Sequence, residues 1–502
     1  MPTGAVAPPP LLEEHAGTHP VASTCAAATS STPSRSSDSA GGEENTAARL
    51  DHWRRVNAYY HRKVISYLRF AVPEGQSVLF VGCEDGASLA ALKPSRGVGV
   101  DRRSEMIELA RRRHGSHEYL HTSYESFQID EQFEYLVLND IPNEVDDIQA
   151  FLRNLLPLCT PTTRLVIVQH NYLWRPILRL TARLGLKCPE SPPNWLSAGD
   201  LEMFLYAAGF ETVEVRRKLF VPRHLFYVGE LLNRIMGVVP FFSRLASTEI
   251  LIARPSPGLR PPDYRSCTIV LTTRDECSNI EPMVRAIPKV GEHTEILFVE
   301  GHSVDGTREE IKRVAAAYPD KNIRLVVQDG IGQGDAIREG FKQAQGDVVI
   351  LLEADQTSPA EDVLKVWELI STGRADFVNG TRAVYPMTPG AMPPVNRLGN
   401  LLFAVWFTWF LGQRTTDVLC GIKGISKRQF QKLERNWGFL GLFDPFGDFE
   451  LLFGASRLGL QICEVPTRYR PRVYGQTKSR VLSHGWILAR MAARATGVFK
   501  CR

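Results

Sequence analysis

The sequence lacks the features that mark membrane-spanning, secreted and nucleic-acid-binding chains. No apolar run reaches the roughly 20 residues that a membrane-spanning helix needs, and the nearest one, at 400–412, is too short. The first 50 residues hold no apolar stretch typical of a secretory signal, and their two arginines against five acidic residues do not fit a transit peptide. The net charge of +4 is too small to favour nucleic acid as a partner.

Paired cysteines are also missing. The nine cysteines are scattered, with no C-x-x-C pair and no metal-ligand spacing. That pattern is typical of small apolar thiols in a reducing compartment, so we expect a cytoplasmic protein. Residues 1–50 are rich in Ala, Ser, Thr, Pro and Gly. Because such a segment buries too little apolar surface to offset the entropy of ordering, we predict a disordered tail there.

The rest of the chain divides at a proline-rich segment. Residues 253–266 contain four prolines, which is typical of an exposed linker. On both sides of it, strand-like apolar runs alternate with helical patterns, so we predict an α/β protein with two doubly wound domains. Their ligands should lie at the carboxyl ends of the strands. The predicted parts are a first domain, a linker, a second domain and a C-terminal helix, at 51–254, 255–265, 266–480 and 481–502.

Each half supplies a series of apolar strand candidates. In the first half they are 77–82, 97–101, 135–140 and 164–169, followed by an antiparallel pair expected at the sheet edge, 210–220 and 248–255. In the second half they are 267–276, 295–301, 323–329, 347–355 and 375–382. The near-continuous apolar character predicts strands covered by helices on both faces.

In the first half, two glycines and an acid stand where a nucleoside ligand would need them. Gly82 and Gly86 follow the first strand, where glycine lets the backbone approach a ligand. Asp101 ends the next strand, where an acid can accept both ribose hydroxyls. The alternative is a tight strand-to-helix turn without a ligand.

With VLFVGCEDG, VGVDRRSEMIELAR and FEYLVLNDIPNEVDD, this half resembles class I S-adenosylmethionine-dependent methyltransferases over about 53–254. The resemblance implies a Rossmann-like domain that binds S-adenosyl-L-methionine. It places Gly82 and Gly86 at the methionine end and Asp101 at the ribose. Asn139 and Asp140 would line the pocket near the methyl group.

Two acidic residues follow the apolar run at 348–352, where a buried strand is expected to end. Glu353 and Asp355 stand two residues apart, so both carboxylates can reach one ligand at that edge. Mg²⁺ and Mn²⁺ bind carboxylate oxygens together with substrate phosphates. The alternative is a solvated turn in which Asp355 caps a helix.

Other predicted strand ends carry groups suited to the same ligand. They are acids for a base and a ribose, glycines before a helix, where anions are favoured, and an arginine for a diphosphate. These residues are Asp275, Glu276, Glu300, Asp305, Gly330, Gly332, Gly334 and Arg382. Together with the acidic pair they predict a nucleotide-diphosphate site.

Over about 267–479, the second half resembles family 2 glycosyltransferases, most of all the dolichyl-phosphate mannose and glucose synthases. The matching motifs are VEGHSVDGT, GQGDAIREGFKQAQGD, EAD, GTR, TTDVLCGIKGISK and RPRVYGQTKS. The resemblance implies a GT-A fold, a UDP- or GDP-sugar donor and transfer with inversion. Glu353, Asp355 and Gln356 would hold Mg²⁺ or Mn²⁺. The implied donor contacts are Glu276, Glu300, Asp305, Gly332, Gly334, Arg382 and Arg472.

The acceptor decides which further groups the reaction needs. A hydroxyl needs a general base, for which Asp448 and Glu450 are candidates, whereas a polyprenyl phosphate is already anionic and needs cations. Lys478, with the arginines around it, is a candidate cation, unless these residues form an ordinary solvated face. Residues 400–411 fit either a buried helix or one in a membrane interface with Trp406 and Trp409 at headgroup depth.

We therefore expect a bifunctional enzyme that meets the cytoplasmic face of a membrane. One half transfers a sugar to a polyprenyl phosphate or a glycan, and the other transfers a methyl group. The basic residues at 481–502 would suit anionic lipid. Two alternatives stay open: the first half is a non-catalytic binding module, or the second is a sugar nucleotidyltransferase. Such enzymes usually carry a longer Gly-rich basic loop than TTRDECSN.

Overall fold

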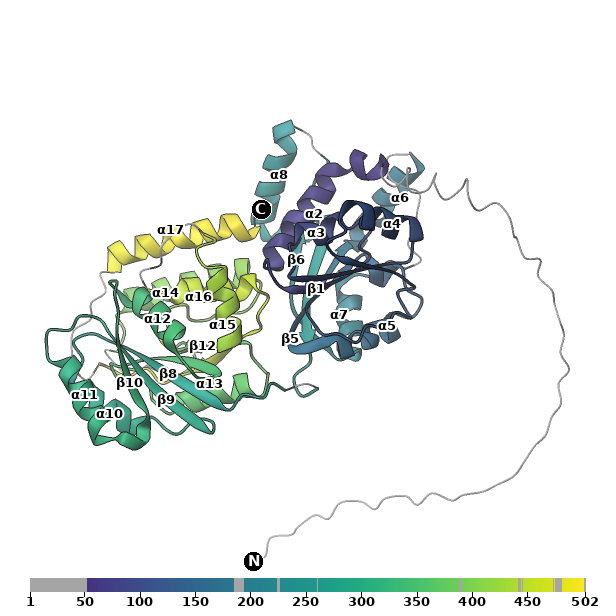
Figure 1. The fold of residues 1–502 in the computed structure, drawn as a ribbon. Helices are drawn as coiled ribbons and strands as arrows, with labels where there is room; N and C mark the ends of the chain where they lie inside the picture. Colours follow the sequence, from purple (N-terminus) through teal and green to yellow (C-terminus); the bar gives the residue numbers. More distant parts are fainter. Residues whose placement is uncertain are drawn as a thin grey trace, which may run out of the picture.

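The computed structural model describes residues 52–184, 194–223, 226–259, 261–387, 391–440, 444, 446–472, 474 and 481–500. They form two α/β domains in succession, each built on a seven-stranded sheet with helices on both faces (Figure 1). The predicted fold class is therefore confirmed. The predicted disordered tail and the candidate cation Lys478 lie outside the described residues.

The N-terminal sheet combines five parallel strands with an antiparallel pair, in the order β3-β2-β1-β4-β5-β7-β6. β7 runs antiparallel to both β5 and β6, as predicted for the edge. The strands are β1 (Ser77–Val81), β2 (Arg96–Asp101), β3 (Glu118–His121), β4 (Phe133–Asn139), β5 (Cys159–His170), β6 (Phe210–Lys218) and β7 (Thr248–Pro255). The helices are α2 (Ala58–Ala71), α3 (Ala87–Ala91), α4 (Ser104–Arg113), α5 (Ile148–Asn154), α6 (Arg175–Arg183), α7 (Ala198–Ala207), α8 (Phe226–Val238) and α9 (Pro240–Ser243).

The C-terminal sheet is mixed, in the order β10-β9-β8-β11-β13-β12-β14. β13, which was not predicted, runs antiparallel between β11 and β12. The strands are β8 (Ser266–Thr273), β9 (His293–Glu300), β10 (Ile323–Val327), β11 (Val348–Glu353), β12 (Phe377–Thr381), β13 (Lys423–Ser426) and β14 (Ile462–Pro466). The helices are α10 (Ile280–Ala286), α11 (Thr307–Ala317), α12 (Gln333–Gln343), α13 (Asp362–Ser371), α14 (Pro394–Leu411), α15 (Lys427–Arg435), α16 (Asp448–Arg457) and α17 (Val481–Lys500).

The apolar segment at 400–411 forms most of α14, and one side of it is buried. Phe407 lies in the hydrophobic core, whereas Leu402 on the other side is 63% exposed. Trp406 donates a hydrogen bond to Thr496 of α17, so this indole packs between helices rather than on the exposed side. Of the helices in the described ranges, none has the length and apolar character needed to cross a bilayer.

A buried ion-pair network joins the two domains. Arg164 of β5 and Arg254 of β7 both contact the Asp376 carboxylate, which lies just before β12, at 2.5 Å and 3.2 Å. Burial alone would raise the pKa of Asp376, but the two guanidinium groups outweigh it and hold the pKa below its usual value. Arg164 also donates to the carbonyl oxygen of Gly459. The domains therefore meet through charges that have no access to water.

We expect Asp376→Asn to lower the free energy of unfolding by about 3–5 kcal/mol, because it leaves two buried arginines without their shared counter-charge. Urea unfolding followed by tryptophan fluorescence measures this change. Asp320→Asn, at an exposed position, is the control and should change stability by less than about 0.5 kcal/mol. Equal stabilities of Asp376→Asn and the control would contradict the prediction.

Candidate functional site

The strand register brings the acidic ends of the C-terminal sheet to one edge. Thr273 at the end of β8 pairs with Glu300 at the end of β9, and Thr272 pairs with Glu353 at the end of β11. Glu300 and Glu353 therefore flank β8 at nearly the same level, as parallel strands require. This edge is the candidate site of the C-terminal domain.

Arg472 ties together two of the predicted site acids. One of its terminal nitrogens lies 2.7 Å from Oδ2 of Asp355, and the other lies 3.3 Å from Oε1 of Glu276. The second oxygen of Asp355 accepts hydrogen bonds from the backbone and hydroxyl of Thr357. Asp355 and Glu276 come from different strand ends, so Arg472 marks the point where the predicted metal ligand and the predicted donor contact meet.

Gln356, the third predicted metal ligand, joins the same network. Its backbone adopts a positive φ of 59°, which a non-glycine residue adopts rarely. Its amide nitrogen donates to Oδ1 of Asn279 at 3.0 Å, and Asn279 in turn donates to Glu276 at 2.6 Å. The side chain thus reaches toward Glu276 across the end of β8.

Glu353 and Asp448 form a second acidic group beside the first. Burial, followed by the neighbouring carboxylates of Asp355 and Asp448, raises the pKa of Glu353. Burial raises the pKa of Asp448 to about 6, although the buried ammonium of Lys423 lies 3.2 Å away. Gln333 donates to Glu353. This crowding of carboxylates is what a divalent cation would relieve.

The acids fit a divalent cation that also binds a ligand. In the part of the chain that the structure describes, no three His, Cys, Asp or Glu side chains converge closely enough to hold a metal ion by themselves. Mg²⁺ and Mn²⁺ sites in phosphate-handling proteins commonly use one or two carboxylates and complete the shell with phosphate oxygens and water. Glu353 and Asp355 would supply the protein's share.

Arg382, predicted to contact a diphosphate, lies in a buried ion pair instead of facing open space. Its Nε and one terminal nitrogen donate to the two oxygens of Asp417 at 2.6 Å and 2.8 Å. The ring of Tyr469 covers it, with the guanidinium carbon 5.0 Å from the ring centroid. Any phosphate would meet an arginine that is already held in place by Asp417.

The remaining predicted donor contacts have structural partners of their own. Glu300 is fully buried and accepts hydrogen bonds from Arg308, which sequence analysis did not single out. Asp305 accepts from the backbone of Cys277 and from Thr307 at the start of α11. Gly332 begins α12 with a φ of 97°, and Gly334 packs closely on Gly447.

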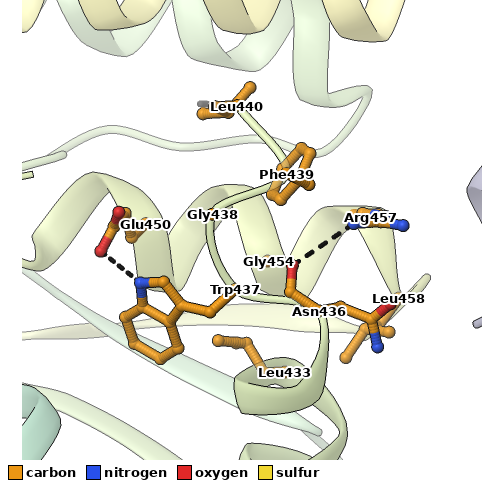
Figure 2. Close-up of a pocket in the computed structure, with 10 residues that line it drawn as sticks. All are labelled: Leu433, Asn436, Trp437, Gly438, Phe439, Leu440, Glu450, Gly454, Arg457 and Leu458. Atoms are coloured by element: carbon orange, nitrogen blue, oxygen red, sulfur yellow. Dashed lines mark hydrogen bonds between the residues drawn. The ribbon is translucent and has the colours of Figure 1, made fainter. Parts of the chain in front are cut away.

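Glu450, the second candidate base, points away from this group. Figure 2 shows it in a small pocket beside α16, where its carboxylate accepts a hydrogen bond from the indole of Trp437. The carboxylate also lies 3.6 Å from Arg338. Of the two candidate bases, therefore, only Asp448 is close to the acidic pair.

The N-terminal domain holds a cavity of about 320 Å³ at the carboxyl ends of β1, β4 and β5, with α2 over it. Of the predicted cofactor residues, Gly82, Asn139 and Asp140 line it. Gly82 has a φ of 77°, and a Cβ there would lie 2.7 Å from the side chain of Ile141. Gly86 packs on Tyr119, so a close contact within the protein explains the glycine.

Asp101, the predicted ribose ligand, lies behind the cavity wall. It is fully buried, and Arg103 donates to its two oxygens at 2.9 Å and 3.0 Å. The backbone nitrogen of Glu84 donates to it as well. Arg103 lines the cavity and Asp101 does not, so the Arg103 guanidinium lies between the Asp101 carboxylate and the cavity.

Several cavity residues were missed by sequence analysis. His170 ends β5, and its ring stacks on Tyr60 of α2 with centroids 5.3 Å apart. Its backbone nitrogen donates to Asp140, and its Nε2 lies 3.8 Å from the other oxygen of that carboxylate. Trp174 and Trp195 complete this side. Of these residues, only His170 could have been found from the sequence, because it is a polar residue directly after the apolar run at 164–169, where a strand was expected to end.

Each half of the chain matches the model of a known family. A model of a methyltransferase domain matches residues 50–215, and one of glycosyl transferase family 2 matches residues 268–450. The glycosyltransferase AglJ of Haloferax volcanii is 31% identical over 209 residues, which are 41% of this chain and 64% of that protein. A dolichyl-phosphate hexose transferase of the same organism is 29% identical over 220 residues, 43% of this chain and 87% of the relative.

Among solved structures, a SAM-dependent methyltransferase of Thermotoga maritima, described as a possible histamine N-methyltransferase, is similar to 42% of this chain. The match covers 96% of that protein at 18% identity, with a TM-score of 0.33. By the family models, residues 50–215 match a methyltransferase domain and residues 268–450 match glycosyl transferase family 2, one after the other along the chain.

Proposed function

We propose that the C-terminal domain transfers a sugar from a nucleoside-diphosphate sugar to a polyprenyl phosphate, with Mg²⁺ or Mn²⁺ as cofactor. The observation that carries this proposal is that Arg472 contacts both Glu276 and Asp355, which come from two other segments, at one sheet edge. The relative named as a dolichyl-phosphate hexose transferase supports a lipid-phosphate acceptor.

Each part of this edge has a task in sugar transfer. The metal ion, when bound, neutralises charge that develops on the leaving diphosphate. Asp355 and Glu353 would hold it, and Arg472 would add a second positive charge once Asp355 binds the metal. An anionic acceptor needs no general base, so Asp448 serves mainly to balance the buried ammonium of Lys423.

An assay of the full chain tests this proposal. UDP- and GDP-sugars are offered with a short polyprenyl phosphate or with the corresponding free polyprenol, with and without Mn²⁺. We expect transfer to the phosphate only, and only with the metal. Transfer to the free alcohol at an equal rate would favour a hydroxyl acceptor with Asp448 as base. Release of a nucleotide-sugar from a sugar phosphate and a nucleoside triphosphate would favour a nucleotidyltransferase.

We propose further that the N-terminal domain binds S-adenosylmethionine in its cavity and transfers the methyl group. The cofactor carries a sulfonium, an ammonium and a carboxylate, and the cavity offers groups of both signs. The acids are Glu84, Asp85, Asp140 and Glu144, and the arginines are Arg54, Arg103 and Arg223. Methyl transfer needs mainly alignment of acceptor and sulfonium, which a cavity of this size can provide.

Glu144 gives a pH test of this assignment. Burial raises the pKa of Glu144 to about 7, with Arg102 and Arg103 opposing the shift. Because an ionised Glu144 attracts a sulfonium, we expect the affinity for S-adenosylmethionine to rise about three- to tenfold from pH 6 to pH 8. Binding of uncharged-sulfur S-adenosylhomocysteine should rise much less. Isothermal titration of the full chain measures both.

Glu144→Gln is the matched variant, since it keeps the shape and removes the charge. His61 and His170 line the same cavity, so the test rests on the difference between wild type and variant. The variant should bind both ligands with the same pH dependence. An unchanged preference in Glu144→Gln would place the sulfonium elsewhere. If neither ligand binds the wild-type chain, the domain is a non-catalytic module.

A further inference from the structure

An apolar face on the N-terminal domain lies next to the entrance of its cavity. On α6 and the turn before it, every third or fourth residue is a large apolar side chain that is 48–63% exposed: Leu173, Ile177, Leu180 and Leu184. At 3.6 residues per turn, this spacing puts the four on one side of the helix. Trp174, Leu178 and Thr181 follow the adjacent side and line the cavity. The same helix thus presents one side to the cavity and another to solvent.

The pair α8–α9 continues this face. Its exposed apolar residues are Val228, Leu231, Leu232, Ile235, Val238, Val239, Phe242 and Leu245. The inner side of α8 packs on the domain: Glu230 contacts Lys63 and Tyr59 of α2, and Asn233 caps the backbone of Phe220 and Val221. The exposed apolar side is therefore not the one that holds the helix in place.

Hydrogen bonds join the two parts. Asn171 donates to the carbonyl oxygens of Arg244 and Ala246, and Trp174 donates to that of Leu245 at 2.8 Å. The exposed Leu245 is therefore hydrogen-bonded through its carbonyl oxygen to the residue that follows the exposed Leu173. In the view of Figure 1, α6 and α8 lie at the same end of the domain with α2 between them. We call the exposed apolar side chains of α6, α8 and α9 the docking face.

The charged residues around the docking face indicate which kind of partner this apolar surface binds. Segment 171–184 contains no acidic residue and three arginines, of which Arg175 packs on the cavity residue Trp195 and Arg179 and Arg183 are exposed. Segment 219–247 contains three arginines and one acid, Glu230, which is paired with Lys63. Short amphipathic helices with arginines beside an aliphatic side are typical of proteins that rest on an anionic bilayer.

We propose that the docking face seats the methyltransferase domain on an anionic bilayer, and that the methyl acceptor is a lipid-borne molecule that enters the cavity past α6. The second half of this statement rests on the proposed methyl transfer, and the first half does not. Because Ile177 belongs to both the docking face and the cavity lining, an acceptor with a hydrocarbon chain would move from lipid to cavity along a continuous apolar path.

Vesicle flotation of the full chain tests the docking face. Phosphatidylcholine vesicles are compared with vesicles in which phosphatidylglycerol replaces about a third of the lipid. The variant Leu180→Gln, Leu184→Gln, Leu231→Gln, Ile235→Gln should bind the anionic vesicles about tenfold less than wild type. The matched control is Met203→Gln, Tyr206→Gln on α7, two exposed apolar residues outside the docking face. It should bind like wild type.

A second variant tests whether the C-terminal domain, instead of the docking face, binds the vesicles. Leu398→Gln, Leu402→Gln removes exposed apolar residues of α14. If this variant alone abolishes vesicle binding and the docking-face variant binds like wild type, the proposal is overturned. It is overturned as well if the docking-face variant converts a dimer to a monomer in gel filtration without changing vesicle binding, which would make the face a protein interface.

Brominated lipid tests the entry path without any methyl-transfer assay. In a Trp486→Phe background, which removes an exposed indole of α17, brominated phosphatidylcholine in the anionic vesicles should quench tryptophan fluorescence. Trp174→Phe should remove a large share of that quenching. Quenching that is the same with and without Trp174 would overturn the path past α6. Failure of S-adenosylmethionine binding would affect the proposed methyl transfer and leave the flotation result standing.

Discussion

Asp355→Asn should lower the rate of sugar transfer on the order of a thousandfold, because it weakens the metal that stabilises the leaving diphosphate. Asparagine keeps the size of the side chain, and its oxygen can still accept the hydrogen bonds from Thr357. The fold should therefore survive. Steady-state assays with Mn²⁺ varied at saturating donor measure the rate and the metal requirement together.

The control is Glu361→Gln, an exposed acid six residues beyond Asp355 that precedes α13. It should keep the wild-type rate. The thermal midpoint of Asp355→Asn should lie close to that of wild type, since the substitution removes one of three carboxylates from a crowded group. A rate within about threefold of wild type would contradict the metal assignment, because the loss of a direct metal ligand should lower the rate of transfer far more than that.

Much of the fold follows from local pattern. Long apolar runs such as 347–355 and 164–169 predicted β11 and β5. A strand that helices cover on both faces is apolar at nearly every position, so it stands out in the sequence. The strands that were missed, β3, β13 and β14, have four, four and five residues. β13 includes Lys423 and Gly424, which local preference disfavours in strands. Pairing with β11 and β12 stabilises it, and pairing is not visible in the sequence.

The strand-end acids were predictable because parallel strands end at one edge, but their partners were not. Arg472 and Asp355 are 117 residues apart, and Arg382 and Asp417 are 35 apart. No periodicity relates such distant positions. Conversely, the difference between Asp448 and Glu450 follows from helix geometry alone. Residues that are two positions apart on a helix point about 200° apart, so Asp448 lies beside Lys423 and close to Glu353, whereas Glu450 turns toward Trp437.

Arg472→Gln should change two measurements in opposite directions. In the structure the Arg472 guanidinium forms ion pairs with Asp355 and Glu276. It therefore competes with a metal ion for the Asp355 carboxylate. Removing that charge should tighten Mn²⁺ binding in the absence of donor by about tenfold. The same substitution should lower kcat about a hundredfold, because the leaving diphosphate loses a fixed cation.

The opposite signs separate this role from a merely structural one. A variant that loosened the site would weaken both Mn²⁺ binding and catalysis. If Arg472 competes with the metal before the donor binds and stabilises the diphosphate afterwards, its loss must strengthen Mn²⁺ binding and weaken catalysis. Arg374→Gln, an arginine paired with Glu368 on α13, is the control and should change neither quantity. Titration of Mn²⁺ into the donor-free chain, followed by single-turnover rates with donor and acceptor, gives both numbers. Weaker Mn²⁺ binding in Arg472→Gln would show that the arginine organises Asp355 for the metal instead of competing with it.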